Sequence, residues 1–484
     1  RQRGDTMNFK LVLKITGKTL LVVALCMVVP LLVTLYYGEP LSPFLYSIGI
    51  LVVLGTLLAR LKAEPHFFSR ESFFTVGLIW ILFGIFGALP FWFSGYFETF
   101  VDCVFESISG FTTTGASILK AVENLPRGIL FWRSFTHWLG GMGVLILTIA
   151  LLPSLGISGT QLAKAETPGP VVSKLVPKAS DSSKILYAIY LVMTIFEVIC
   201  LLLTGMPLFD CVTNSFATAG TGGFSVRNLS IGAYNSPAAE VIITVFMLLF
   251  SLNFSVYFLL LCGKWRQALK SDELRFFGGI VGASIVLVTV NISGAFANVW
   301  EALRHAAFQV GSIISTTGFS STDFDGWPQF SRVLLVVLMF VGACAGSTGG
   351  AMKCSRILVI CKSIGMEIRQ IIHPRSVNVV KLDGEVLSDR TLHSIQVFFG
   401  AYLLIILGAT MVIALDNFSF GTTFTAVVSC IGNVGPGLEL VGPMGNYAAF
   451  SPFSKIILTA CMVIGRLEVF PILVLFSSEA WVRR

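Results

Sequence analysis

Four short tracts rich in Thr and Gly follow half-length apolar stretches of this chain. Aligned on their last glycine they are residues 111–115, 216–220, 314–318 and 431–435, and these glycines lie 98 to 117 residues apart. A unit that recurs four times at similar spacing indicates a repeat architecture. Bare backbone is tolerated at membrane depth only where protein buries it or where it lines a watery cavity. Four such tracts around one axis would present a ring of carbonyl oxygens, which can hold a dehydrated monovalent cation.

The residue types in the tracts suit this chemistry. Glycine adopts positive φ without steric strain, so successive carbonyl groups can turn the same way. The alternative, glycines that only let helices pack closely, fits the cluster at 140–143 better than it fits the tracts. The predicted cation ligands are Thr112, Thr113, Thr114 and Gly115; Thr218, Ala219, Gly220 and Thr221; Thr316, Thr317 and Gly318; and Asn433, Val434 and Gly435.

Composition indicates a membrane protein. Of the 484 residues, 55% are hydrophobic and only 12% charged, with a mean hydropathy of +0.84, whereas soluble domains carry roughly 25% charged residues. Ten apolar runs approach or exceed the ~20 residues that span a bilayer. They are 20–37, 41–59, 73–93, 129–152, 185–203, 241–262, 276–290, 333–345, 394–415 and 456–476. The predicted fold class is therefore an all-α polytopic membrane protein.

The basic residues predict the orientation, because Lys and Arg accumulate in cytoplasmic loops. Six segments between or beyond the apolar runs hold 25 of the 33 Lys and Arg residues. These segments are 1–18, 60–71, 153–184, 263–275, 353–390 and 483–484. Both termini are therefore expected in the cytoplasm. The net charge of +7 does not indicate nucleic-acid binding, since it is confined to loops between spans.

The runs divide into a two-span appendage and four units, each a span, a short pore helix, a tract and a second span. The predicted limits are 1–70 for the appendage and 71–175, 176–275, 276–390 and 391–484 for the pore repeats. The pore helices are expected at 100–110, 209–216, 299–313 and 420–429, all too short to cross a bilayer. This pattern predicts a pseudo-fourfold arrangement of the repeats around one pore.

The remaining polar residues indicate no enzyme. The ten cysteines form no Cys-x-x-Cys pair, and the five histidines include no His-x-x-x-His. The cysteines are interpreted as small buried hydrophobes, and His137 as a hydrogen-bonded packing residue. Neither a catalytic constellation nor a nucleotide-binding motif is present, so we expect no organic cofactor and no catalysis.

The second span of the third repeat is interrupted. Residues 342–352 include Gly346, Ser347, Thr348, Gly349 and Gly350 in succession, and each interior glycine costs a helix about 1 kcal/mol relative to alanine. A phosphate-binding loop is excluded, because Ala-Met-Lys follows the glycines rather than Gly-Lys-Ser/Thr. The segment is therefore expected to be irregular and to line a cavity within the membrane.

Arg466 is expected near the middle of the last span, about 16 Å from the start of that span at Lys455. Such an arginine costs about 2.5–3.5 kcal/mol or more unless it faces water or a partner. One interpretation is a positive charge beside the pore that slows cations. The alternative is an interhelical ion pair with an acid such as Glu197.

Residues 109–117, 217–225, 315–319 and 432–436 resemble the corresponding tracts of the Trk/Ktr/HKT superfamily of potassium uptake proteins, above all its bacterial TrkH branch. The resemblance covers nearly the whole chain from about Lys14. It implies that the four tracts form a K+ filter, that Gly115 favours potassium over sodium, and that the segment 342–352 is a movable gate beneath the filter. It also implies K+ as the transported ion and the bacterial inner membrane as the location. The implied partners are membrane lipid, a second copy in a homodimer, and a cytosolic nucleotide-binding subunit of the TrkA type.

Two mechanisms remain open at this stage. The first is a potassium-selective channel or facilitator driven by the membrane potential. The second is a K+ symporter coupled to H+ or Na+, since coupled transporters also use broken helices near the membrane midplane. The common orientation of the repeats favours the channel, because inverted repeats are typical of the coupled class.

Overall fold

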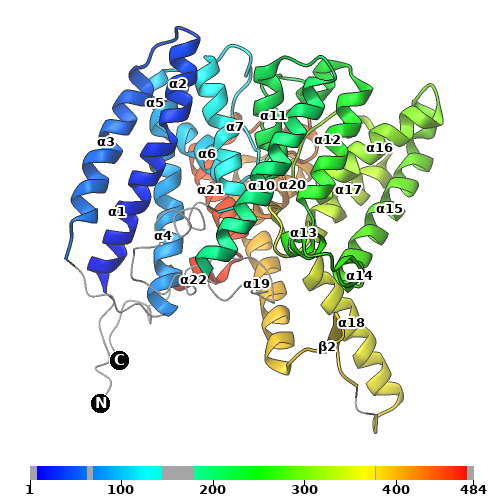
Figure 1. Ribbon diagram of the computed structural model, residues 1–484. Coiled ribbons are helices and arrows are strands. Elements are labelled where there is room, and N and C mark those ends of the chain that lie inside the picture. The colour runs from blue at the N-terminus through cyan, green and yellow to red at the C-terminus, as the bar shows by residue number, and fades with distance from the viewer. Residues whose placement is uncertain (1–7, 63–68, 144–178, 377, 477–484) are drawn as a thin grey trace, which may run out of the picture.

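The computed structural model describes residues 8–62, 69–143, 179–376 and 378–476 (Figure 1). Regular structure in these ranges is helical, apart from one antiparallel hairpin of β1 (Lys381–Leu382) and β2 (Glu385–Val386). The prediction of an all-α polytopic fold is confirmed. Several predicted segments lie partly outside the described residues, namely 1–18, 60–71, 129–152, 153–184 and 353–390, and the tail 483–484 lies wholly outside them.

The N-terminal appendage is a helical hairpin. Its first limb is α1 (Phe9–Cys26), continued beyond Met27 by α2 (Val28–Tyr36), and its second limb is α3 (Ser42–Ala59). The limbs meet at Gly17, where an added Cβ would lie only 2.8 Å from the Gly55 carbonyl oxygen. The missing side chains therefore bring the two backbones together, as in other membrane helix pairs.

The remaining elements follow the predicted order of span, pore helix and second span. The first spans are α4 (Ser69–Gly87), α10 (Ala179–Leu202), α15 (Asp272–Ile292) and α19 (Asp389–Ile413). The pore helices are α6 (Phe100–Phe111), α11 (Leu208–Gly220), α16 (Val299–Ile314) and α20 (Phe420–Gly432). The second spans begin with α7 (Arg127–Gly141), α12 (Pro237–Phe250), α17 (Gln329–Val341) and α21 (Pro452–Arg466). The remaining helices are α5 (Leu89–Ser94), α13 (Phe254–Leu261), α14 (Trp265–Ala268), α18 (Cys354–Ile372), α22 (Phe470–Phe476), η2 (Ser230–Tyr234), η3 (Ser293–Ala295), η4 (Phe324–Gly326), η5 (Ala414–Asp416) and η6 (Glu439–Val441).

Helix length separates the two kinds of span. Six helical segments of the described residues are long and apolar enough to cross a bilayer, namely the two limbs of the appendage and the four first spans. The second spans differ from the expected continuous runs, because α7, α12, α17 and α21 are only 13 to 15 residues long. The prediction placed a break in the third repeat alone.

The breaks in the second spans share a place in the repeat. In the second repeat, α12 and α13 meet at 90° across Ser251–Asn253. In the third, residues 342–353 separate α17 from α18, and in the fourth, Glu468 and Val469 adopt positive φ between α21 and α22. In the first, α7 ends at Gly141 and Gly143 adopts positive φ. Short helices beside irregular backbone are tolerated here because protein surrounds them.

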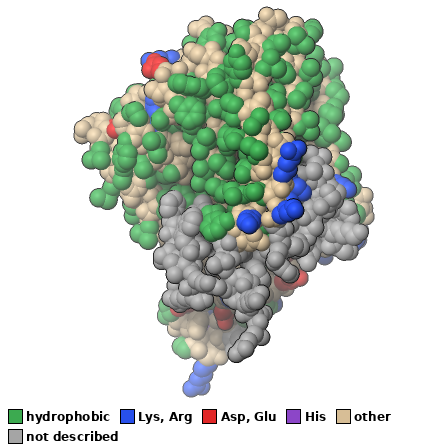
Figure 2. Space-filling view, turned by 90° about the vertical axis from the view of Figure 1, so that its left-hand side faces the viewer, with side chains coloured by type: hydrophobic (Ala, Val, Ile, Leu, Met, Phe, Trp, Pro, Cys, Tyr) green, Lys and Arg blue, Asp and Glu red, His purple; other side chains and the backbone are tan. Residues whose placement is uncertain are grey.

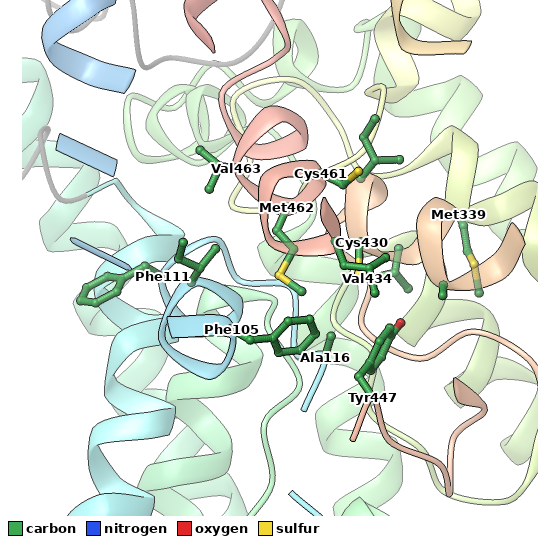
Figure 3. Packing of buried hydrophobic residues seen from close by; sticks show 14 of the residues in the cluster. Phe105, Phe111, Ala116, Met339, Cys430, Val434, Tyr447, Cys461, Met462 and Val463 are labelled. Atoms are coloured by element: carbon green, nitrogen blue, oxygen red, sulfur yellow. The ribbon is translucent and has the colours of Figure 1, made fainter. Parts of the chain in front are cut away.

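The pore helices and second spans make up the interior, and the first spans lie outside them. Phe105 of α6, Val427 of α20 and Met462 of α21 are fully buried, and Figure 3 shows their neighbours Ala116, Cys430 and Tyr447 converging in one cluster. The appendage presents a broad hydrophobic surface, with Lys and Arg at its lower border (Figure 2). Each pore helix starts with a local signal: Thr99, Asn298 and Ser419 accept backbone N–H groups as N-caps, and α11 starts after Pro207.

Candidate functional site

The four pore helices end in the same backbone turn. One N–H group beyond each helix donates to the carbonyl oxygen five residues earlier, at 2.8 to 2.9 Å. The residue before this N–H and the glycine after it both adopt positive φ. The donors are Thr114, Gly222, Thr317 and Val434; the preceding residues are Thr113, Thr221, Thr316 and Asn433; the glycines are Gly115, Gly223, Gly318 and Gly435. Tracts 1 to 4 are residues 112–115, 220–223, 315–318 and 432–435.

The second tract differs from its predicted alignment by three residues. The sequence alignment made Gly220 the counterpart of Gly115. In the structure, Gly220 is the last residue of α11, and Thr218 and Ala219 lie inside that helix. The equivalent glycine is Gly223, and Thr221 is the residue at positive φ. The turn needs an acceptor five residues back, which Ala217 supplies to Gly222, so α11 continues to Gly220, past its predicted end at residue 216.

The glycines of the tracts pack against carbonyl oxygens of the neighbouring tracts. In each case an added Cβ would overlap the oxygen of the residue before the next tract's glycine. The pairs are Gly115 with Gly222, Gly223 with Thr317, Gly318 with Val434, and Gly435 with Thr114. The tracts therefore close into a ring in the order 1, 2, 3, 4, and four equivalent carbonyl groups belong to it. The pseudo-fourfold arrangement is a property of the structure.

Opposite tracts of the ring resemble each other more than adjacent ones do. In tract 1 the hydroxyls of Thr112 and Thr114 are 2.8 Å apart, and in tract 3 those of Ser315 and Thr317 are 2.7 Å apart. Tracts 2 and 4 begin with glycine instead. Asn433 of tract 4 donates through Nδ2 to the Thr114 hydroxyl at 3.0 Å. The ring therefore combines fourfold backbone geometry with twofold side-chain chemistry.

Buried polar side chains brace the ring from behind. Glu106 of α6 pairs with Arg133 of α7 at 2.7 Å and also accepts the Ile118 N–H at 3.1 Å. Arg133 continues to the Ser225 carbonyl oxygen at 3.2 Å, which links the loops after tracts 1 and 2. The pair is buried, so losing one partner would leave an uncompensated charge.

His137 is hydrogen-bonded in the interior. Its Nδ1 lies 2.8 Å from the Gly110 carbonyl oxygen and its Nε2 accepts the Phe224 N–H at 3.2 Å. An imidazole that donates at Nδ1 and accepts at Nε2 is neutral. His137 therefore fixes the end of α6 to the loop after tract 2, in keeping with the packing interpretation.

A cavity of about 150 Å³ opens onto the ring on the side of the loops that follow the tracts. All four ring glycines line it, together with Lys120, Arg133 and Arg227. Glu106 neutralises Arg133, and Asp210 lies 3.4 Å from Arg227. Lys120 is exposed. This face of the ring is thus accessible to solvent, and its local charge can be altered at Lys120.

The opposite side of the ring is covered by the intramembrane loop, residues 342–353, which is buried except at Gly346. The Gly350 N–H donates to the Thr316 hydroxyl of tract 3 at 2.8 Å, and Gly349 and Gly350 pack against tracts 3 and 4. The Thr348 hydroxyl donates to the Phe250 carbonyl oxygen at the break after α12. The loop therefore lies beneath the ring, as its composition predicts for a segment inside the protein.

Arg466 ends α21 and connects the loop to the ring. Its guanidinium donates to the Thr113 hydroxyl at 3.2 Å and to the Thr348 carbonyl oxygen at 2.7 Å. It also donates to the carbonyl oxygens of Gly140 and Gly141, at 2.5 and 2.9 Å. The alternative ion pair with Glu197 does not form, because neither carboxylate oxygen of Glu197 has a hydrogen-bond partner among the described residues.

Further charged groups, to which the sequence alone did not point, surround the intramembrane loop. Glu468, within the break of the last span, pairs with Arg356 of α18, and Lys353 Nζ donates to the Gly349 carbonyl oxygen. Glu273 of α15 accepts the Ala345 and Ser355 N–H groups at 2.7 and 3.1 Å. An acid beside the first apolar residues of a span could have signalled this role, since charges at such depth need partners.

The model of the TrkH family, described as a cation transport protein, matches residues 44–483. This chain belongs to the TrkH family. It is 38% identical to the Trk system potassium uptake protein TrkH of Salmonella typhimurium, over 98% of this chain and all of that protein. It is 32% identical to the Trk system potassium uptake protein TrkG of Escherichia coli K12, over 99% of each.

A solved member of the TrkH family has the same architecture. The crystal structure of the potassium transporter TrkH from Vibrio parahaemolyticus superposes with a TM-score of 0.87 at 33% identity, over 98% of this chain and all of that chain. The predicted family is therefore confirmed. The chain is a multi-pass membrane protein of a cation transport family, and that family is not one of enzymes.

Proposed function

We propose that this chain carries K+ into a bacterial cell across the inner membrane, through the ring formed by tracts 1 to 4. The observation that carries the proposal is the closed order of the tracts, in which each ring glycine packs on a carbonyl oxygen of the next tract. Such a ring replaces the hydration shell of a monovalent cation. Relatives over nearly the whole chain are named potassium uptake proteins, which supports K+ as the substrate.

In the proposed mechanism, the face with the 150 Å³ cavity is the outer entrance and the intramembrane loop is the gate. This orientation places the basic segments 263–275 and 353–390 in the cytoplasm, as Lys and Arg bias requires. In the described state, two bonds hold the loop across the ion path. Gly350 is bonded to Thr316 of tract 3, and Arg466 is bonded to Thr113 of tract 1. Opening would release these bonds and move the guanidinium away. The channel is favoured over H+- or Na+-coupled symport, because four like repeats surround one ring.

The structure also supports a cytosolic partner, proposed to be of the TrkA type. Helix α18 projects away from the membrane part of the molecule together with the hairpin β1–β2 (Figure 1). Ile364, Ile368 and Ile371 lie on one side of it at helical spacing, and they are 52 to 72% exposed. An apolar stripe on a basic cytoplasmic helix fits a protein partner, and the relatives are described as parts of a Trk system. A homodimer of the membrane subunit remains part of the proposal.

Gly115→Ser tests the ring. The residue has φ +77°, which costs a side chain about 1–2 kcal/mol, and its Cβ would displace the Gly222 carbonyl group. We expect the K+/Na+ permeability ratio, from bi-ionic reversal potentials, to fall about tenfold or more while total cation flux falls less. Gly95→Ser is the matched control, because Gly95 has φ +73° but no heavy atom within 4 Å of an added Cβ. Unchanged selectivity in folded Gly115→Ser protein would contradict the ring as the filter.

A further inference from the structure

An apolar groove of about 620 Å³ lies between the appendage and the second pore helix. Val29, Leu32 and Tyr36 of α2 form one wall, Phe131 of α7 forms its floor, and Leu208 belongs to the N-terminal end of α11. Leu32 and Leu208 are 58 and 61% exposed. Because α1 and α2 together form a candidate span, Phe9–Tyr36, this wall lies at membrane depth. Hydrocarbon rather than water is therefore the solvent of the groove.

The polar end of the groove is positively charged. Arg127, the first residue of α7, has its guanidinium carbon 4.4 Å from the Tyr37 ring centroid and 5.7 Å from that of Phe209. Among the described residues Arg127 belongs to no ion pair. Glu39 lies on the backbone side of Arg127: its carboxylate accepts the N–H groups of Arg127 and Gly128, at 2.7 and 2.9 Å, and does not pair with the guanidinium.

A second guanidinium lines the same groove but is matched. Arg227 lies 3.4 Å from Asp210, which also accepts the Tyr234 hydroxyl at 2.8 Å. The Arg127 guanidinium is therefore the one in this lining that has no carboxylate partner among the described residues. Tyr36 and Tyr37 stand at this end, where aromatic residues mark the boundary between hydrocarbon and headgroups.

We propose that this groove is a binding site for an anionic phospholipid, with an acyl chain along α2 and the phosphate group on Arg127. A guanidinium and a phosphate form paired, charge-assisted hydrogen bonds, and the aromatic rings hold the guanidinium in place. A headgroup with its own ammonium would bring a third cation beside Arg127 and Arg227, so phosphatidylglycerol fits better than phosphatidylcholine. A second protein copy could cover the apolar wall but would leave this charge unmatched.

The bound lipid would connect two parts of the molecule that carry different functions. Its chain contacts α2 of the appendage, and its other side contacts Leu208, Phe209 and Val212 of α11, the helix that leads into tract 2. Occupation should therefore stabilise the second pore helix. The proposed orientation enters only in assigning the groove to the outer leaflet, and the binding itself does not depend on the proposed transport of K+.

The test is lipid-dependent thermal unfolding of the purified full chain, with phosphatidylglycerol, phosphatidylcholine or inorganic phosphate added. We expect phosphatidylglycerol to bind about tenfold or more tightly than phosphatidylcholine, and phosphate alone to give no stabilisation. Arg127→Gln should abolish the preference, and Arg127→Lys should retain part of it. Lys120→Gln is the matched control, since it removes the same charge from the same face outside the groove.

Three results would overturn the proposal. Equal affinity for the two lipids would show that the groove does not select the headgroup. Stabilisation by phosphate alone would indicate a free-anion site. An unchanged lipid preference in Arg127→Gln would show that the guanidinium does not bind the phosphate group. Val212→Trp fills the groove from α11 and should exclude both lipids while Arg127 remains. If Arg127→Gln does not fold, the comparison of lipids on the unmodified chain and on Arg127→Lys decides. None of these readouts requires ion flux, so failure of the transport proposal would be seen separately.

Discussion

Arg466→Ala removes a guanidinium that touches both the ring and the loop, 3.2 Å from the Thr113 hydroxyl and 2.7 Å from the Thr348 carbonyl oxygen. A cation held by the ring at the level of Thr113 would be repelled by this charge. At an effective dielectric constant of 20, two unit charges 8 Å apart repel by about 2 kcal/mol. If that repulsion limits entry, its removal increases flux by about 30-fold, since 1.36 kcal/mol is a factor of ten in rate.

The same substitution also predicts a change in stability. Four acceptors lose a charged donor, and hydrogen bonds to charged groups contribute about 1.5–3 kcal/mol each. Water that enters beneath the ring can bind the freed carbonyl groups, so the protein should unfold at a lower temperature but remain folded at 25 °C. All four of these hydrogen-bond acceptors are neutral, so none of them is left as an uncompensated charge.

Rubidium uptake into proteoliposomes and thermal unfolding, measured on one preparation, are the assays for Arg466. Arg466→Gln should increase flux as Arg466→Ala does, because both lack the charge, whereas Arg466→Lys should stay near the unmodified level. A folded Arg466→Ala protein with unmodified flux would refute the electrostatic argument. So would an Arg466→Lys protein that conducts as well as Arg466→Gln, because the charge would then be irrelevant.

Three further predictions concern the gate, the entrance and the fourth pore helix. Deletion of residues 346–350 should increase basal K+ flux severalfold in proteoliposomes, because it removes the bond to Thr316; folded protein with unmodified flux would count against the gate. Lys120→Glu should increase single-channel conductance at low ionic strength and leave it unchanged near 1 M salt, where screening removes the field, whereas a gain that persists in high salt would contradict this mechanism. The Ser419 hydroxyl donates to Glu439, and so do the hydroxyl and the backbone N–H of Thr422. These bonds, that of Ser419 first, hold the pKa of the Glu439 carboxyl below its ordinary value. Glu439 therefore stabilises the fold above the pKa of the unfolded state and loses this contribution as pH falls through its lower folded pKa. Glu439→Gln should lower the melting temperature at pH 7 and lower it less at pH 3, and an equal loss at both values would show that the charge is not involved.

Much of the architecture follows from local sequence. The first spans are long apolar runs whose backbone must bond internally in lipid, so a helix is the available solution for each. The pore helices follow from apolar stretches too short to cross, with Thr99, Asn298 and Ser419 at their starts. Four repeats predict a ring because like units in one orientation can close around an axis. The irregular segment at 346–350 also follows from its glycines alone.

Other features depend on contacts between distant residues. The register of tract 2 is one example, since Gly220 and Gly223 are both glycines, and the bond from Gly222 to Ala217 together with the positive φ of Gly223 distinguishes them. The break at Ser251–Asn253 is another, because the run is apolar on both sides and the bend is stabilised by the Cys344 N–H on the Ser251 carbonyl oxygen.

Arg466 shows the division most clearly. The sequence by itself placed a charge at membrane depth, and the energy of burying it required a partner or water. It could not decide between Glu197 and the ion path, because a guanidinium is satisfied equally by a carboxylate or by several carbonyl groups. Only the tertiary structure brings Thr113, Thr348 and the end of α7 within hydrogen-bond distance of it. The sequence determines which groups must be satisfied, whereas packing determines which atoms satisfy them, since those atoms come from repeats more than 100 residues apart.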